Sequence, residues 1–425
     1  MEYYTRKEEK IPVIAETDVL VVGAGPGGIG AAVTAARSGA SVMIIEQCGD
    51  VGGISTSGLM SHWTGDVKSK LYSEILQKSA EKNMFSDEIT NLIDPENLKS
   101  IYLEMLTEAK VRILIYTFAS GVVTEKNKVR GVIVENKSGT GFIKAKVVID
   151  ASGDGDIAAK AGAEYFKGRE TDGKMQTATL MFKVGGVDTE KAVILWRFED
   201  TYQTEKGELQ ALAREHLKAP AGHVLLYPTT LPGIITCNMT NCIDIDGTDA
   251  EALTRAEIEC RAQIEPIVKF LREFAPGYEN CFAISSASLI GIRETRHFKG
   301  MKTITEHDIA EARRFDDRVV ENAYFNFDVH NISGSGLDKT GVQNKFTQMK
   351  GYTIPYGCLV PEKIDGLLLS GRNISGTHMA HSNFRAMPIC LAIGCGGGAA
   401  AAVAVKENIE VRDVDAEKIQ KILFN

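Results

Sequence analysis

Cysteine pairs with the spacing of metal or redox motifs are missing from this sequence. The chain has eight cysteines in 425 residues, but no C-x-x-C occurs. Cys237 and Cys242 are five residues apart, as are Cys390 and Cys395, and this spacing is not typical of a zinc site, an iron–sulfur cluster or a redox disulfide. We therefore predict no metal site and expect free thiols, packed as small hydrophobic side chains in a cytoplasmic protein.

The sequence also lacks an excess of positive charge and a long apolar run. Lysine and arginine number 48 against 56 acidic residues, for a net charge of −8, which argues against nucleic-acid binding. No apolar run is expected to approach the roughly 20 residues that span a bilayer. The segment 391–405 is apolar but mostly alanine and glycine, and the N-terminal MEYYTRKEEK is polar rather than signal-like. We expect no nucleic-acid partner and no membrane span.

The stretch 18–46 contains a strand, a glycine turn, a helix and a second strand. Gly23, Gly25 and Gly28 form G-x-G-x-x-G directly after a continuously apolar strand. The first glycine permits a tight turn, the second lets the backbone approach a pyrophosphate, and the third lets helix and strand pack closely. Glu46 ends the second strand, about 20 residues further on, where a carboxylate would hold a ribose hydroxyl. This pattern predicts that an adenine dinucleotide binds here.

Three other segments have the composition expected where the backbone approaches a ligand. The loop 48–58 is rich in glycine and hydroxyl residues and follows the second strand, and His62 comes soon after it. The segments 145–156 and 364–372 are apolar strands that end in small residues and glycine. Strands of a parallel sheet deliver their carboxyl ends to one ligand-binding edge.

The order of these segments predicts an α/β fold. We expect a Rossmann-like lobe with a parallel sheet and a β-hairpin or meander near 121–135, plus an inserted mixed α+β substrate lobe. The predicted boundaries are 1–164 for the first part, 165–355 for the insertion, which is more polar and has few glycine turns, and 356–425 for the closing part. In the insertion, 253–274 and 307–318 have helical patterns, and Thr305 can cap the second.

These motifs together resemble the two-dinucleotide-binding-domain flavoproteins. The first fingerprint continues past the glycines with Ala32, Gly39, Val42 and Glu46, and the second is the stretch 151–154, Ala-Ser-Gly-Asp. Within that superfamily the chain resembles a bacterial family of FAD-dependent oxidoreductases, from about residue 18 to about 405. The segments that carry this resemblance are GGISTSG (52–58), DASGDGD (150–156), GRETDGKMQTATLMFKVGGVD (168–188), GIRETRHFKG (291–300), RRFDD (313–317) and GRNISGTHMAHSNFR (371–385).

The resemblance implies FAD as the cofactor and a set of residues around it. Gly23, Gly25 and Gly28 would face the pyrophosphate and Glu46 the adenosine ribose, while Gly52, Gly53 and Thr56 would lie near the flavin. Asp154 or Asp156 would lie near the ribityl–pyrophosphate region, and Gly371 and Arg372 would close the site. A helix starting near Gly394 would point its N-terminus at the pyrimidine end of the flavin. The remaining members of the predicted set are Pro26, Gln47, Ser57, Ser152 and Gly153.

Catalysis by a flavin dehydrogenase requires a base and groups that orient the substrate. His378 and His381 flank the final turn from strand to helix, with Arg385 beyond them, and His62 follows the glycine loop. Because histidine titrates near neutrality, each of the three is a candidate base or a hydrogen-bonded structural residue.

A second charged cluster lies in the predicted insertion. On a helix, Arg293 and Arg296 would share a face, and His297 would lie one turn from Arg293. His297 also stands where the resemblance leads us to expect a second basic residue. These side chains could clamp a carboxylate or a hydroxyl-rich substrate, or form an ion-pair network between the lobes. The segment 324–330, with a tyrosine, an aspartate and a histidine, is a weaker candidate of the same type.

We therefore expect an FAD-dependent enzyme that transfers a hydride between flavin N5 and a small polar metabolite, at the hydroxyl-bearing carbon of a sugar, polyol or hydroxy acid. The alternative is a C–C/C=C dehydrogenase or reductase of the fumarate-reductase type. A flavin-binding module without turnover is a third possibility. Because a second complete glycine fingerprint is missing, direct use of NAD(P)H is not indicated, and the electron donor or acceptor stays open, as does a homo-oligomer.

Overall fold

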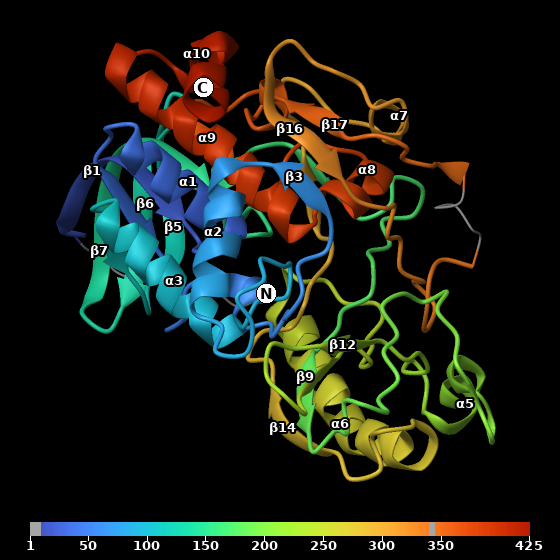
Figure 1. The fold of residues 1–425 in the computed structure, drawn as a ribbon. Helices are drawn as coiled ribbons and strands as arrows, with labels where there is room; N and C mark the ends of the chain where they lie inside the picture. Colours follow the sequence, from blue (N-terminus) through green and yellow to red (C-terminus); the bar gives the residue numbers. More distant parts are fainter. Residues whose placement is uncertain (1–9, 340–344) are drawn as a thin grey trace, which may run out of the picture.

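The computed structural model describes residues 10–339 and 345–425, so the polar N-terminal segment lies almost entirely outside it. Its larger part, the sheet lobe, is built on a seven-stranded sheet of order β4-β2-β1-β7-β6-β5, with β18 also paired to β7 (Figure 1). The strands are β1 (Val13–Val22), β2 (Val42–Ile45), β4 (Arg112–Leu114), β5 (Phe118–Glu125), β6 (Lys128–Asn136), β7 (Gly139–Asp150) and β18 (Leu367–Leu369). Strands β4, β2, β1, β7 and β18 run parallel, while β6 and β5 form an antiparallel meander. This confirms the predicted α/β fold with a parallel sheet and a hairpin.

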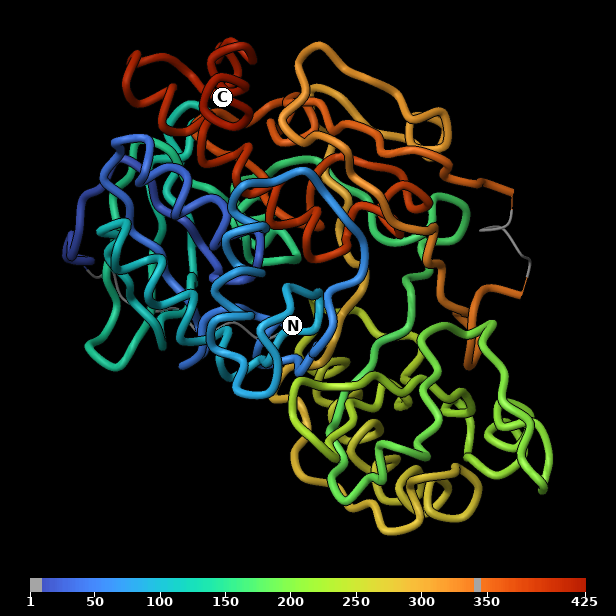
Figure 2. The backbone as a smooth tube through the Cα atoms, in the orientation of Figure 1, coloured from blue at the N-terminus to red at the C-terminus, as the bar shows by residue number. Residues whose placement is uncertain are grey.

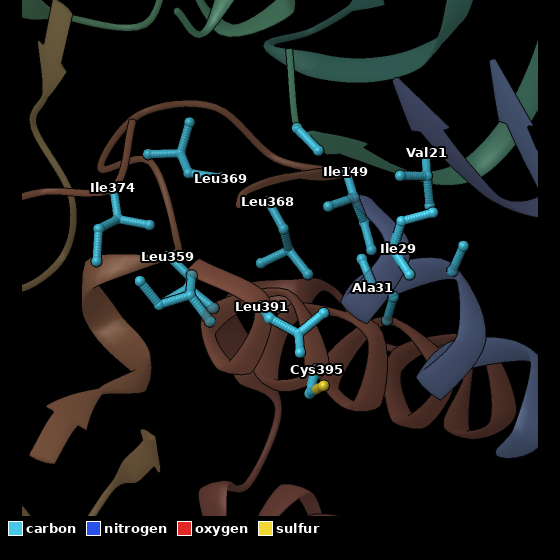
Figure 3. Close-up of a cluster of buried hydrophobic side chains, with 14 of the residues drawn as sticks. Val21, Ile29, Ala31, Ile149, Leu359, Leu368, Leu369, Ile374, Leu391 and Cys395 are labelled. Atoms are coloured by element: carbon cyan, nitrogen blue, oxygen red, sulfur yellow. The ribbon is translucent and has the colours of Figure 1, made fainter. Parts of the chain in front are cut away.

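The central strands are buried along their carboxyl halves. Residues 19–22 of β1 pair with 42–45 of β2 on one side and 147–150 of β7 on the other, and all four are buried. Helices α1 (Pro26–Arg37) and α9 (Met387–Glu407) pack on this sheet. Figure 3 shows the side chains that meet there, among them Val21 of β1, Ile149 of β7, Leu368 of β18 and Leu391 of α9. A strand with covered faces needs the continuous apolar run that the sequence has.

Glycine lets α1 and α9 touch through their backbones. A Cβ on Gly394 would lie 2.0 Å from the Gly27 carbonyl oxygen, and one on Gly398 would lie 2.2 Å from the oxygen of Ala31. A Cβ on Gly30 would likewise lie 2.2 Å from the Leu391 carbonyl oxygen. The expectation that a helix starts near Gly394 is therefore wrong, because α9 starts at Met387 and Gly394 packs inside it.

The α9 helix also corrects the expectation about apolar length. It has 21 residues and a mean hydropathy of 1.9 over its most apolar window, so by length and composition it could cross a membrane. Its isoleucine, leucine and valine residues raise the mean hydropathy above that of its alanines and glycines. However, 94% of the window is buried inside the protein, and the packing against α1 and the sheet explains its apolarity. One such helix is weak evidence for a membrane span.

A second body, the inserted lobe (178–287), has hydrophobic clusters of its own. Figures 1 and 2 show it as a green-to-yellow body beside the sheet lobe. Its antiparallel sheet has the order β12-β13-β9-β14. The elements are β9 (Phe182–Gly185), β10 (Gln203–Thr204), β11 (Gly207–Glu208), α5 (Leu209–His216), β12 (Leu226–Pro228), β13 (Ile235–Cys237), α6 (Ala250–Phe274) and β14 (Phe282–Ser286). By contrast, Phe298, Val320 and Ile354 pack in the core of the sheet lobe, so the separately packed body is smaller than the predicted insertion 165–355.

The other elements connect the two lobes and complete the sheet lobe. They are β3 (Asp66–Lys68), α2 (Lys70–Glu81), α3 (Pro95–Glu108), α4 (Asp156–Lys160), β8 (Tyr165–Lys167), β15 (Arg296–Phe298), α7 (Glu306–Ala310), β16 (Arg318–Tyr324), β17 (Tyr352–Pro355), α8 (His378–Phe384) and α10 (Ala416–Phe424). Thr305 caps α7 through a capping box, as predicted. The predicted helix over 307–318 is too long, because α7 ends at Ala310 and β16 begins at Arg318 to pair with β17 and β3.

The backbone contact between α1 and α9 predicts a sharp difference between neighbouring glycines. Gly394→Ala should lower the free energy of unfolding by about 3 kcal/mol, since the new methyl group would overlap a backbone carbonyl that cannot move aside. Gly397→Ala is the matched control, because its Cβ would meet nothing nearer than 3.8 Å and alanine favours a helix. Thermal unfolding of both variants checks this, and equal stabilities would contradict it.

Candidate functional site

Small residues at the ends of three parallel strands form a cradle. Gly23 follows β1 with a φ of +96°, and a Cβ there would lie 2.4 Å from the Ala151 carbonyl oxygen that follows β7. Gly27, in the first turn of α1, lies against Ser370 and Gly371 after β18. Gly25 differs, since its Cβ would meet nothing within 4 Å. There is therefore open space beside Gly25 at the start of α1. Because the first backbone N–H groups of a helix have no partner within it, this is the geometry that binds a phosphate.

The cradle opens into a cavity of about 1780 Å³. Eleven of the predicted cofactor residues line it: Gly23, Gly25, Pro26, Glu46, Gln47, Gly53, Ser152, Gly153, Asp154, Gly371 and Arg372. The Asp154 carboxylate accepts hydrogen bonds from Arg372 and from Thr295, each at 2.6 Å, so it joins the closing segment to the chain that returns from the inserted lobe. Glu46 accepts from the backbone N–H of Ala24 at 2.8 Å and of Cys48 at 3.0 Å, which fixes its carboxylate at the rim.

Five predicted cofactor residues lie behind the lining of this cavity, in the described part of the chain. Gly28 packs against Gly23, where a Cβ would lie 1.9 Å from the carbonyl oxygen, as its packing role predicts. The Thr56 side chain lies against Gly52, and its hydroxyl donates a hydrogen bond to the Val51 carbonyl oxygen at 2.6 Å. The Ser57 hydroxyl donates to the Asp50 carboxylate. Gly394 lies within α9. These residues shape the cradle, and their contact with a cofactor stays a prediction.

The cavity continues into an aromatic chamber at the inserted lobe. Trp196 and Tyr227 belong to that lobe, and His62 of the sheet lobe packs on both, with ring centroids 4.7 Å and 5.1 Å away. All three line the cavity, together with the apolar residues Met60, Met181, Phe198, Leu225, Leu253, Ile258, Leu289, Ile290, Ile292, Phe325, Phe327, Leu337, Phe346 and Met387. Burial lowers the pKa of His62 to about 4, so its imidazole is neutral at pH 7.

A charged group borders the same cavity. Arg385 donates to the Asp328 carboxylate at 2.6 Å, and His330 lies 3.3 Å from it. Burial alone would raise the pKa of Asp328, but His330 and Arg385 outweigh burial and lower it, so the group is ionised. Arg293 donates to the Thr177 oxygen at 2.6 Å and to the Thr179 hydroxyl at 3.0 Å, and burial lowers its pKa to about 10. Arg293 therefore stays charged at pH 7, and both arginines are already held by protein partners.

The segment that contains Arg293 and Arg296 is not a helix, which corrects the predicted shared face. Residues 292–295 have no regular secondary structure, and Arg296 opens strand β15. The side chains consequently diverge, because Arg296 donates to the Asp156 carboxylate at 2.8 Å while Arg293 lines the cavity. The pattern is that of a network between segments rather than a two-arginine clamp.

Three of the predicted catalytic histidines gather around Glu294 instead of lining the cavity. His297 lies 2.8 Å and His378 lies 2.6 Å from the same carboxylate oxygen, and the His381 ring packs on His297 with centroids 4.8 Å apart. Burial alone would raise the pKa of Glu294, but the hydrogen bonds from His297 and His378 lower it. Burial also favours neutral His378, yet its bond to Glu294 raises the pKa of His378. Among the described lining residues, the predicted catalytic set is represented by His62, Arg293 and Arg385.

The sequence reasoning missed the aromatic chamber. Tyr227 lies on the three-residue strand β12 and Trp196 in an irregular segment, so neither stands in a periodic pattern that could have singled it out. Asp328 and His330, considered only as weak candidates, prove to border the cavity next to Arg385. The D-x-H spacing of Asp328 and His330 was the feature of the sequence that pointed to them.

A parallel sheet with a glycine cradle at its carboxyl edge is the architecture of a dinucleotide-binding fold. The open space beside Gly25 and the large cavity that the start of α1 lines fit FAD. The chain belongs to the FAD dependent oxidoreductase family, which it matches over residues 18–423. The cofactor is FAD, and the protein is an FAD-dependent oxidoreductase.

Curated relatives resemble part of this chain. The digeranylgeranylglycerophospholipid reductase 1 of Methanococcoides burtonii is 31% identical in an alignment of 195 positions that covers 41% of this chain and 46% of that protein. The digeranylgeranylglycerophospholipid reductase of Methanocella arvoryzae is 30% identical in an alignment of 165 positions that covers 35% of this chain and 41% of that protein. Each match thus spans less than half of the relative.

Solved structures share the fold at low identity. A geranylgeranyl bacteriochlorophyll reductase-like protein from Thermoplasma acidophilum has a TM-score of 0.50 at 15% identity, covering 96% of this chain and 82% of that one. The anhydrotetracycline hydroxylase of Streptomyces rimosus has the same TM-score of 0.50 at 9% identity, covering 96% and 65%. Because one is named a reductase and the other a hydroxylase, the likeness establishes fold and not reaction.

The relatives contradict the predicted main reaction. They are named as reductases of a geranylgeranyl lipid, so the expectation of hydride transfer at a hydroxyl-bearing carbon of a small polar metabolite is wrong. The finding favours the alternative, a reaction at a C=C bond. The physical reason for the error is visible in the site, because arginines counted as substrate ligands already have internal partners.

The open space at Gly25 allows the cofactor loop to be tested apart from folding. Gly25 has a φ of −69°, which valine adopts readily, so Gly25→Val should fold but fill the cradle and purify without stoichiometric FAD. The visible spectrum and the ratio of flavin to protein measure this. Equal melting temperatures of the variant and of wild-type protein stripped of flavin serve as the folding control, and a normal flavin content in the variant would contradict the assignment.

Proposed function

We propose that this protein is an FAD-dependent reductase of carbon–carbon double bonds in an unsaturated lipid. The observation that carries the proposal is the continuity of one cavity from the glycine cradle into the aromatic and aliphatic chamber. FAD, when bound, supplies or accepts the hydride. The relatives named as geranylgeranyl-lipid reductases support the same substrate class.

The size and chemistry of the cavity favour a large apolar substrate. Its volume of about 1780 Å³ exceeds the roughly 300–1,000 Å³ of a site for one small ligand, which leaves room for a cofactor and a chain beside it. Aliphatic residues of α6, Leu253 and Ile258, also line the cavity. An unsaturated hydrocarbon chain would gain free energy by displacing water from such walls.

A small unsaturated dicarboxylate fits the charged groups less well. A clamp for two carboxylates needs cationic groups with free donors directed at the substrate. Here Arg385 is paired with Asp328 and Arg293 is held by Thr177 and Thr179. The Arg385–Asp328 pair carries no net charge, which is compatible with an uncharged chain passing beside it.

Reduction of a C=C bond requires a proton donor as well as a hydride. Tyr227 is the group that suits this role, because burial raises the pKa of Tyr227 to about 12 and the phenol keeps its proton at pH 7. The Asn238 amide donates to the Tyr227 oxygen at 3.2 Å and orients it. Burial lowers the pKa of both His62 and His330 to about 4, so each is a neutral imidazole, whose N–H is a far weaker acid than a phenol.

The substrate class can be tested with chemically reduced enzyme. Under anaerobic conditions, a lipid that carries geranylgeranyl chains should reoxidise the flavin and gain two hydrogens per reduced double bond. Absorbance of the flavin and mass spectrometry of the lipid measure this. Fumarate is the small-acid comparison, and reoxidation by fumarate but not by the lipid would refute the proposal.

Tyr227→Phe tests the proton donor. The variant should retain FAD and its fold but slow lipid reduction by roughly 10²-fold or more, because phenylalanine has no hydroxyl to donate the proton that must accompany the hydride. Tyr324→Phe is the control, since Tyr324 also lines the cavity but is 45% exposed. Stopped-flow reoxidation of the flavin compares the two, and equal rates would exclude Tyr227 as the donor.

A further inference from the structure

We propose that Glu294, His297 and His381 form a buried binding site for one divalent transition-metal ion of the zinc type. The site lies outside the lining of the FAD cavity in the described part of the chain, and it is independent of the reaction proposed above. No cysteine takes part, so this site could not be recognised from cysteine spacing.

The three side chains converge on a common point. One ligand atom from each, a carboxylate oxygen and two imidazole nitrogens, lies within 4.8 Å of the other two. The rings of His297 and His381 have centroids 4.8 Å apart and an interplanar angle of 78°. Two imidazoles that share an ion through bonds of ~2.1 Å have centroids about 4.5–5.2 Å apart, so the spacing of these rings is compatible with a shared ion once the donor atoms close around it.

Burial gives the cluster the character of a built site. Glu294 and His297 are 0% exposed and His381 is 1% exposed. The Nδ1 atoms of His297 and His381 have no hydrogen-bond partner among the described residues, although leaving a buried polar atom without a partner destabilises a fold. An ion that engages these imidazoles would offset part of that cost.

The surroundings of Glu294 match those of a metal ligand. Its second oxygen accepts from the backbone N–H of Gln176 at 3.0 Å, and His378 Nδ1 lies 2.6 Å from its first oxygen. Such outer hydrogen bonds orient a ligating carboxylate. Two nitrogen ligands and one carboxylate favour Zn²⁺, Fe²⁺ or Co²⁺ over Mg²⁺ or Ca²⁺, which prefer oxygen ligands.

The placement of the ligands suggests what the ion does. Glu294 and His297 belong to the segment that returns from the inserted lobe, and His381 belongs to α8 of the closing part. An ion between them would join segments more than 80 residues apart in the sequence and fix α8, whose C-cap residue Arg385 reaches Asp328 at the cavity. The role assigned here is structural.

Metal analysis of the wild-type protein is the primary test. Protein purified without chelator and without a histidine tag should contain about one transition-metal ion per chain. Removing the ion with a chelator should lower the melting temperature, and Zn²⁺ but not Mg²⁺ should restore it. Replacement by Co²⁺ should give visible absorption bands of a nitrogen- and oxygen-coordinated ion, recorded on protein freed of flavin. A protein that purifies without metal and binds none on addition would overturn the proposal and leave a hydrogen-bonded network.

Variants assign the ion to these residues. His381→Ala and Glu294→Gln should each abolish the Co²⁺ bands, and His378→Ala should keep them with roughly 10–100-fold weaker binding. His223→Ala, a buried histidine outside the cluster, should leave both metal content and bands unchanged. If His381→Ala and Glu294→Gln fold, as judged by circular dichroism, and keep the full metal content, the ion lies elsewhere and the proposal is wrong.

Discussion

The backbone contact between helices α1 and α9 is the constraint on which the rest of this structure depends. Three glycines, Gly30, Gly394 and Gly398, bring each helix against carbonyl oxygens of the other. The closeness fixes the first turn of α1 beside the turn after β18, and it aligns α9 so that Met387 and Cys390 at its start reach the cavity. The cradle is therefore positioned by rigid backbone packing rather than by flexible side chains.

The inserted lobe completes the site that the sheet lobe begins. Asp154 and Asp156, which follow β7, hold Thr295, Arg296 and Arg372, so the return from the inserted lobe is fastened to the carboxyl edge of the sheet. This fastening sets the aromatic chamber against the cradle. A dinucleotide fold alone is used for many reactions, so the apolar substrate proposed above rests on the chamber and not on the sheet.

Charge in this protein serves mainly to hold the chain together. Arg385 forms an ion pair with Asp328, and Arg293 donates hydrogen bonds to Thr177 and Thr179. The Glu294 carboxylate lies within hydrogen-bond distance of two histidines. A buried charge needs a partner, and here the partners come from the protein. Charged residues near a cavity consequently say little about substrate charge until their partners are known, which is why the arginines suggested a polar substrate that the relatives contradict.

The sequence by itself determined the nucleotide-binding half of the protein. The strand, glycine turn and helix of 18–46, the meander and the Thr305 cap are local patterns, because backbone conformation and burial follow from neighbouring residues. Only the tertiary structure decided which side chains meet. Tyr227, Trp196 and His62 come from distant segments, and Glu294 meets His381 although the two are more than 80 residues apart in the sequence. Such meetings depend on how distant segments pack, and no spacing within one segment records that packing.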